Sequence, residues 1–183
     1  LNNVINRSMI HSWSQENNLE SRLWIPAWEN YILYFSGFLH PRLRSFEIPN
    51  YKKALDRGLG LCSQYAIIVD QVLKSKKIPS KLLGLGGHVV TTVESEDKTW
   101  WILDADYGVV IPHSIQDIYE DPSIITNYYI QKVYSEKEAI EIRDIYQKEE
   151  NFLGEDWYSI NYKYIFILYN ASTFLKWFLP LIL

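Results

Sequence analysis

The sequence predicts an α+β fold, in which helices come first and an antiparallel sheet follows. Apolar residues recur at helical spacing over residues 61–76, whereas residues 88–94 and 99–104 have strand-like patterns separated by a polar turn. The chain has 183 residues, of which 48% are hydrophobic and 22% charged. This composition suits one domain with a buried core and excludes a disordered chain. A run of helices followed by a run of strands is typical of α+β proteins.

The N-terminal part is expected to be helical. Residues 9–40 are rich in aromatic side chains and are interrupted at Pro26 and Gly37, which predicts two short helices packed on the core. Residues 50–57 are predicted to form a helical turn that ends at Gly58, because glycine commonly follows the last residue of a helix.

A buried helix is predicted over residues 61–76. Its apolar face is formed by residues four or three positions apart: Cys62, Ala66, Val69 and Leu73. Gly60 is expected to give a permissive backbone position just before the helix. Ile78-Pro79 is expected to end it, because the residue before a proline disfavours helical geometry.

Four strands and one further helix are then expected. The strands cover residues 81–85, 88–94, 99–104 and 109–111, with a polar turn at 95–98. The helix covers residues 135–150, where Ser135 and Glu138 form a capping box.

Domain organisation follows from hydropathy. Residues 1–160 are expected to form one domain, and residues 161–183 an apolar C-terminal segment. Three alternatives are open for this segment: a helix docked on the domain, the start of a membrane helix, or an interfacial helix. In the last two, residues 164–183 would associate with the membrane. The chain begins at Leu1 and ends within an apolar run, which indicates a piece of a longer protein.

Charge and cysteine content limit the expected binding partners, the cellular compartment and the metal sites. The net charge is −4, and the basic residues are not interleaved with aromatic ones in a patch, so nucleic-acid binding is not expected. A single cysteine cannot form an internal disulfide, which favours a reducing, cytoplasmic compartment. One cysteine and scattered histidines offer no zinc site, and no calcium-binding loop occurs.

Three residues suggest nucleophilic catalysis. Cys62 lies at the predicted start of a helix, where unpaired N–H groups and the helix dipole stabilise a thiolate. His88 opens one strand and Asp104 ends the next. A thiol, an imidazole and a carboxylate are the components of a cysteine nucleophile, its base and the group that orients the base.

The predicted hairpin relates the last two residues. A loop centred on Glu96 would place His88 directly opposite Asp104, so that the carboxylate could hold the imidazole N–H. A loop centred between Glu96 and Asp97 would shift the register by one residue and break this pairing. Asp106 has the same parity and is the alternative carboxylate.

These segments together resemble the core of the transglutaminase-like superfamily. The resemblance covers residues 57–111: Gly60-Leu61-Cys62-Ser63-Gln64-Tyr65-Ala66, then Lys77-Ile78-Pro79, Gly87-His88-Val89-Val90 and Trp100-Trp101-Ile102-Leu103-Asp104. It implies a papain-like fold in which Cys62 is the nucleophile, His88 the general base and acid, and Asp104 the residue that orients His88. The chain departs from the family where Ala105 follows the aspartate, since proline is frequent there.

The resemblance implies acyl transfer on a peptide or protein substrate, without a cofactor. We expect a hydrolytic protease or amidase, because no motif for a second amine substrate is visible. The alternatives are a protein-glutamine transglutaminase, and a non-catalytic or membrane-tethered accessory module of the same fold. The Cys62 N–H is expected to donate to the oxyanion. The candidates for a second donor are Trp24, Trp28, Asn30 and Gln64.

Overall fold

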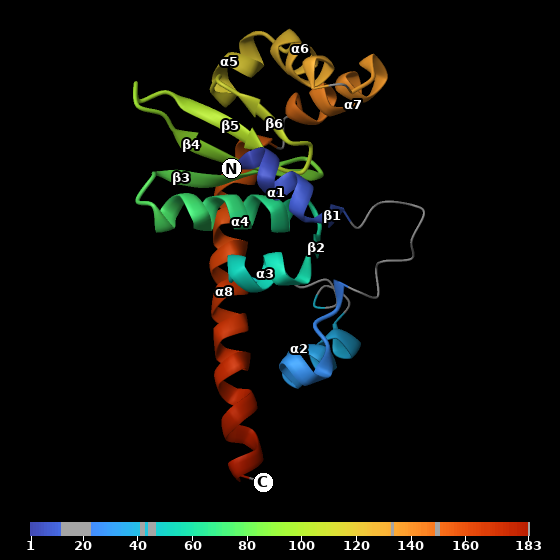
Figure 1. The fold of residues 1–183 in the computed structure, drawn as a ribbon, viewed down its shortest axis with the longest axis vertical. Helices are drawn as coiled ribbons and strands as arrows, with labels where there is room; N and C mark the ends of the chain where they lie inside the picture. The colour runs from blue at the N-terminus through green and yellow to red at the C-terminus, as the bar shows by residue number, and fades with distance from the viewer. Residues whose placement is uncertain (12–22, 41–42, 44–46, 133, 149–150, 183) are drawn as a thin grey trace.

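A computed structural model describes most of the chain. It covers residues 1–11, 23–40, 43, 47–132, 134–148 and 151–182. The fold is α+β, as the sequence predicts, with helices packed around a four-stranded antiparallel sheet of order β3-β4-β5-β6 (Figure 1).

Consecutive strands form the sheet through hairpin connections. The strands are β3 (Ser80–Leu85), β4 (His88–Glu94), β5 (Trp100–Asp104) and β6 (Val109–Ile111), which confirms the four predicted strands to within one residue. The turn between β3 and β4 has only two residues, and Gly87 there has a φ of +107°, which favours glycine. This tight turn makes His88 the first residue of β4, opposite Leu85.

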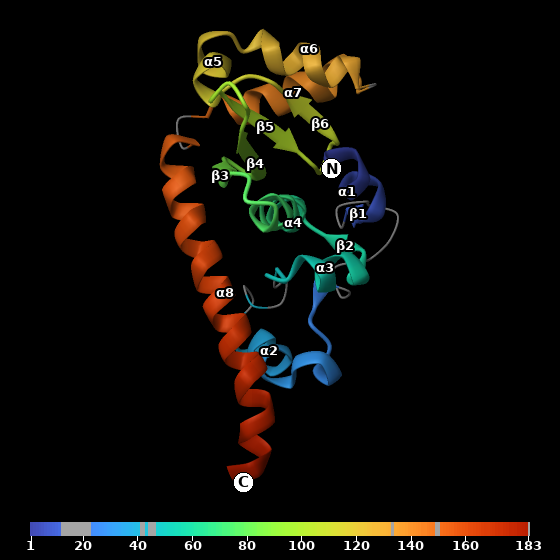
Figure 2. The same cartoon turned by 60° about the vertical axis from the view of Figure 1, so that its left-hand side comes forward.

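Helices cover the two faces of the sheet. The helix α4 (Cys62–Ser75) matches the predicted helix and packs on one face, where the Thr91 hydroxyl donates to the Ala66 carbonyl over 2.9 Å. The opposite face is covered by α5 (Ile115–Glu120), α6 (Ser123–Gln131) and α7 (Glu136–Tyr146). Figure 2 shows the sheet lying between α4 and these three helices.

Capping explains where α5 and α7 begin. The predicted box at Ser135 and Glu138 is present at the start of α7, which ends at Tyr146 rather than at residue 150. Residues 115–131 carry no helix prediction from the sequence, although Ser114 and Asp117 form the same kind of box at the start of α5.

The N-terminal part differs from the prediction of two short helices in residues 9–40. A first helix, α1 (Asn2–Ser8), precedes that range, and Ile10–His11 forms the short strand β1, which pairs in parallel with β2 (Leu59–Gly60). Backbone pairing with the segment before Cys62 therefore replaces a helix at residues 10–11, while residues 12–22 lie outside the described residues.

Two other helices complete this part of the chain. The helix α2 (Ala27–Leu39) is kinked at Asn30, whose φ of −154° and ψ of 91° are not helical. The helix α3 (Tyr51–Arg57) ends at Gly58, as predicted.

The C-terminal helix α8 (Asn151–Ile182) is continuous across the predicted boundary at residue 160 and runs past β3 to α2 (Figure 1). The Lys53 ammonium donates to the Tyr169 hydroxyl over 3.1 Å, and Asn30 Nδ2 donates to the Ser172 hydroxyl over 2.9 Å. Among the helices of the described part of the chain, none has the length and apolar character that a membrane span requires.

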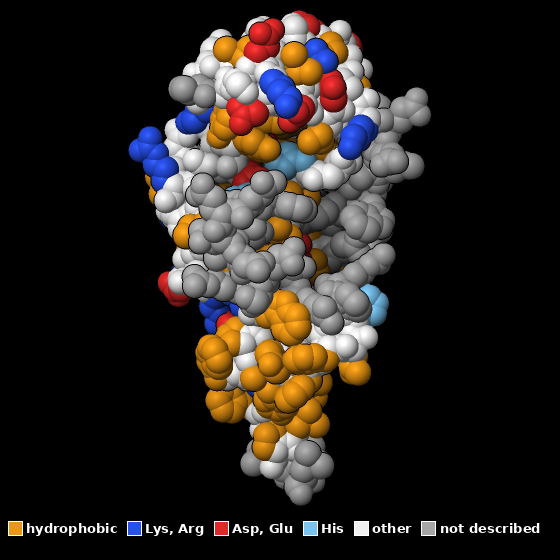
Figure 3. Space-filling view, turned by 90° about the vertical axis from the view of Figure 1, so that its right-hand side faces the viewer, with side chains coloured by type: hydrophobic (Ala, Val, Ile, Leu, Met, Phe, Trp, Pro, Cys, Tyr) orange, Lys and Arg blue, Asp and Glu red, His pale blue; other side chains and the backbone are white. Residues whose placement is uncertain are grey.

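Apolar and charged side chains separate along the molecule. Figure 3 shows hydrophobic side chains gathered at the end formed by α2 and the C-terminal half of α8, with charged ones over α5–α7. The exposed aromatic residues at the apolar end are Trp28, Phe35, Phe38, Phe174, Trp177 and Phe178.

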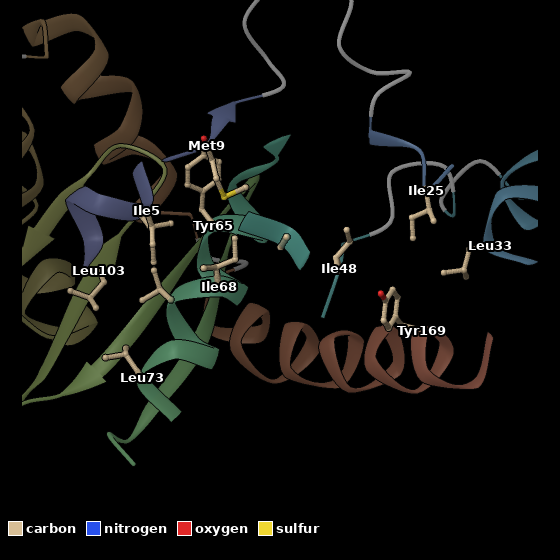
Figure 4. Packing of buried hydrophobic residues seen from close by; sticks show 13 residues of the cluster. Ile5, Met9, Ile25, Leu33, Ile48, Tyr65, Ile68, Leu73, Leu103 and Tyr169 are labelled. Carbon is tan, nitrogen blue, oxygen red and sulfur yellow. The ribbon is translucent and has the colours of Figure 1, made fainter. Parts of the chain in front are cut away.

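One core cluster joins α4 to the elements around it. Tyr65 and Ile68 of α4 lie close to Ile5 of α1 and Leu103 of β5, as Figure 4 shows. This packing fixes α1 and the start of α4 next to the end of β5, where the candidate site lies.

Candidate active site

Cys62 is the first residue of α4 and is half-buried. The strand β2 leads directly into it, with Leu61 at the N-cap. The first N–H groups of a helix have no partner within the helix and favour a negative charge nearby. The thiol thus occupies the position that the sequence predicted for a nucleophile.

Close packing, rather than a special backbone conformation, explains Gly60. Its φ is not in the left-handed region, contrary to the expectation of a permissive backbone position. A Cβ at residue 60 would lie 2.6 Å from the Gln64 Cβ and 3.0 Å from the Met9 Cε. The glycine therefore allows the chain before Cys62 to pass close to the first turn of α4.

Gly60→Ala is expected to destabilise the fold by about 1–3 kcal/mol, the usual cost of overpacking a tight contact. The contact is with a Cβ, which cannot move without the backbone of α4. Urea unfolding would measure the change. An unchanged midpoint of urea unfolding would mean that β2 can move away from α4 at no cost in free energy, and would contradict the close-packing explanation of Gly60.

His88 and Asp104 are in direct contact. The two side chains are buried, with 6% and 0% of their surface exposed, and His88 Nε2 lies 2.8 Å from Asp104 Oδ2. Because an ionised carboxylate only accepts hydrogen bonds, the imidazole N–H donates to it. The pair has the geometry in which a carboxylate fixes the orientation of a histidine ring.

The register that brings them together is neither of the two that the sequence left open. Thr91 pairs with Leu103, so the loop is centred on Asp97 and His88 does not lie directly opposite Asp104. The Asp97 carboxylate accepts from the Thr99 N–H over 3.2 Å and thereby stabilises this longer loop. A shift of two residues preserves the face, so Asp104 meets His88 diagonally.

The alternative carboxylate, Asp106, has a different partner. Its Oδ2 lies 3.0 Å from Nε2 of His11 on β1, an ion-pair distance without hydrogen-bond geometry. The Asn6 side chain donates to the Asp106 carbonyl. The N-terminal elements thus hold Asp106 away from His88, and Asp104 is the carboxylate next to the imidazole.

Electrostatics favour a charged His88. Burial lowers the pKa of His88, but the charge of Asp104 and its hydrogen bond outweigh burial, with a further contribution from hydrogen bonding to Cys62. The net result is a pKa well above the usual 6.5. Below that raised pKa the imidazolium persists next to the thiol, and it is lost as the pH rises through the pKa.

Asp104 is held by groups that the sequence did not indicate. The Tyr129 hydroxyl of α6 donates to Oδ2, and the Tyr107 N–H donates to Oδ1 over 3.2 Å. Asn2 of α1 donates to the Asp104 carbonyl over 3.0 Å and to the Val109 carbonyl over 2.8 Å. The Tyr107 contact is local, but the contacts of Tyr129 and Asn2 join residues 25 to 107 positions apart in the sequence, and no local motif marks them.

Aromatic rings surround the imidazole on the same side. The Tyr107 ring meets the His88 ring edge to face at 5.6 Å between centroids and also contacts Tyr129 and Tyr134. Burial, with the charges of Asp106 and Asp104, raises the pKa of Tyr107 to about 12. The tyrosine hydroxyls therefore remain protonated near neutral pH.

Of the four candidates for a second oxyanion donor, two bond to other groups and a third is exposed on α2. Gln64 bonds to the backbone of Ile48 through both side-chain atoms, and Asn30 bonds to Ser172. Trp28 on α2 is 90% exposed. The fourth, Trp24, precedes α2, and its carbonyl accepts from the Arg57 guanidinium over 2.7 Å.

Comparisons with protein-family models, with curated proteins and with solved structures each found no match to this chain. Within the described residues, no group of three or more His, Cys, Asp or Glu side chains could hold a metal ion.

Proposed function

We propose that this chain catalyses acyl transfer on a peptide or protein substrate, with Cys62 as nucleophile, His88 as general acid and base, and Asp104 as the group that orients His88. The observation that carries the proposal is the buried His88, whose ring bonds to Asp104 and whose pKa, despite burial, is raised above its usual value by Asp104, with a smaller contribution from Cys62. An imidazolium beside a thiol at a helix N-terminus favours the thiolate. The resemblance of residues 57–111 to the transglutaminase-like superfamily supports a papain-like arrangement.

The reaction would proceed through a thioester. The Cys62 sulfur attacks the amide carbonyl carbon, and His88 gives its proton to the nitrogen as the C–N bond breaks and the amine leaves. Water then attacks the thioester, His88 accepts a proton from it, and the C–S bond breaks to release the acid and the thiol. Asp104 remains a carboxylate throughout and holds the ring.

Hydrolysis is the version we favour, as a cysteine protease or amidase without a cofactor in a reducing, cytoplasmic setting. If an amine resolved the thioester in place of water, the same residues would act as a transglutaminase. Incorporation of a labelled primary amine into glutamine-containing peptides would distinguish the two. A non-catalytic or membrane-tethered module is the remaining alternative.

The pH dependence of Cys62 alkylation by iodoacetamide tests the proposal. We expect wild type to react at pH 6 on the order of 10- to 100-fold faster than a free cysteine, whose pKa is about 8.5. His88→Ala should lose most of this advantage, because the imidazolium that stabilises the thiolate is absent. Since Cys62 is the only cysteine, mass spectrometry assigns the product without ambiguity.

Cys62→Ala provides the background rate, and far-UV circular dichroism checks that both variants fold. Equal and slow alkylation of wild type and His88→Ala at pH 6 would contradict the ion pair. The non-catalytic module would then be the better account of the fold.

A further inference from the structure

Tyr129 reaches the candidate site from the layer of helices α5–α7, which covers the face of the sheet opposite α4. It lies on α6 and is fully buried, and its hydroxyl donates to Oδ2 of Asp104. This is the same oxygen that accepts from His88. Asp104 ends β5 on the face that α6 and α7 cover, so its side chain points into their layer.

The direction of this hydrogen bond is fixed by chemistry. Burial, with the charges of Asp104 and Tyr146, raises the pKa of Tyr129 well above 10, so the phenol keeps its proton. The phenol is therefore the donor and the carboxylate the acceptor. A buried O–H to carboxylate bond is among the stronger hydrogen bonds in proteins.

Each oxygen of Asp104 is thus held separately. Oδ1 accepts the Tyr107 N–H at 3.2 Å, and Oδ2 accepts both the Tyr129 hydroxyl and the His88 ring. Without the hydroxyl, the Tyr107 N–H would be the one hydrogen-bond donor among the described residues that holds the carboxylate side chain independently of His88. The orientation of the imidazole toward Cys62 would then be less well defined.

We propose that Tyr129 is a positioning residue of this site, which fixes the Asp104 carboxylate so that His88 remains directed at Cys62. The inference rests on the proposed function and adds a fourth member to the group of side chains. It also assigns a role to α6, whose sequence contains no recognisable motif: this helix holds Asp104 from the face of the sheet that it covers.

Tyr129→Phe tests this role because it removes the hydroxyl and keeps the ring. Tyr134→Phe is the matched control, since Tyr134 belongs to the same aromatic cluster and its hydroxyl donates to the Tyr107 carbonyl over 2.9 Å, not to Asp104. Iodoacetamide alkylation of Cys62 is measured at pH 6 and pH 9.5 for both variants, wild type and His88→Ala. At pH 9.5 a thiolate forms without help from an imidazolium.

We expect Tyr129→Phe to react about tenfold more slowly than wild type at pH 6, the size of effect that follows loss of a hydrogen bond to a charged group. Its rate at pH 9.5 should agree with wild type within about twofold. Tyr134→Phe should match wild type at both values. The decisive quantity for each protein is the ratio of its alkylation rate at pH 6 to its rate at pH 9.5. A purely structural defect would change access to Cys62 equally at both pH values and leave this ratio unchanged.

Other results would overturn the inference. One such result is that Tyr129→Phe has the same ratio of the pH 6 rate to the pH 9.5 rate as wild type or Tyr134→Phe, while His88→Ala still loses reactivity at pH 6. That result would reject the positioning role of Tyr129 and leave the proposed function intact. A wild type no faster than His88→Ala at pH 6 would reject both. Equal losses at both pH values would assign Tyr129 a packing role only.

Discussion

Asp104→Asn is expected to reduce acylation of Cys62 by about 10⁴-fold, the loss seen when the carboxylate of a Ser-His-Asp triad becomes an amide. The amide would have no favourable orientation. With Nδ2 in place of Oδ2, its N–H groups would require the Tyr129 oxygen and His88 Nε2 to accept, which gives His88 the wrong tautomer; after a flip, they would face the Tyr107 N–H, so that a donor meets a donor in a buried position. In either case His88 loses its counter-charge.

Release of p-nitrophenol from p-nitrophenyl acetate, an activated acyl donor, would measure this rate, with Cys62→Ala as background. Asp106→Asn is the matched control, because Asp106 lies two residues away and pairs with His11, not with His88. It should retain most of the activity. Loss of activity at Asp106 with none at Asp104 would reject the assignment of the carboxylate.

The sequence predicted most of the sheet and the helix α4, because their apolar periodicity reflects burial directly. The register of the hairpin could not be predicted in the same way. Strand pattern gives the parity of His88 and Asp104, since alternate residues share a face. The register, however, depends on how Asp97 and Lys98 close the loop, and Lys98 adopts a φ of +67°, which a pattern of polar residues does not specify.

The hydrogen bonds that Asn2 and Tyr129 donate to Asp104 were also not predictable, but for a different reason. Asn2 and Tyr129 lie 102 and 25 residues from Asp104, in elements to which the sequence analysis gave no assignment. Asparagine and tyrosine are frequent on surfaces, and nothing local shows that these two are buried against a carboxylate. Only the packing of α1 and α6 against the ends of β5 and β6 brings them there.

The role of Gln64 also depended on long-range packing. Sequence position made it a candidate oxyanion donor, two residues after Cys62. In the fold its Oε1 accepts the Ile48 N–H over 2.6 Å and its Nε2 donates to the Ile48 carbonyl over 3.0 Å. Gln71, two turns further along the same face of α4, bonds in the same way to the Tyr51 N–H and the Pro49 carbonyl. The two glutamines fasten residues 48–51 to α4.

Gln64→Leu should therefore lower the free energy of unfolding by about 2–6 kcal/mol. Ile48 is 1% exposed, so its N–H and carbonyl would both lose their partners in a buried site, at about 1–3 kcal/mol each. Gln71→Leu is the comparison: Gln71 and Tyr51 are half-buried, so water can replace the lost partner of the Tyr51 N–H, and we expect about 1 kcal/mol. Urea unfolding followed by tryptophan fluorescence would measure both.

The activity of the folded fraction separates structure from catalysis at this position. Under conditions where Gln64→Leu is folded, p-nitrophenyl acetate should acylate Cys62 at close to the wild-type rate, because the amide already bonds to Ile48 and is not available to an oxyanion. A stable Gln64→Leu protein with a rate reduced by about 10²-fold or more would instead identify Gln64 as the second oxyanion donor. The Ile48 pairing would then have to open when substrate binds.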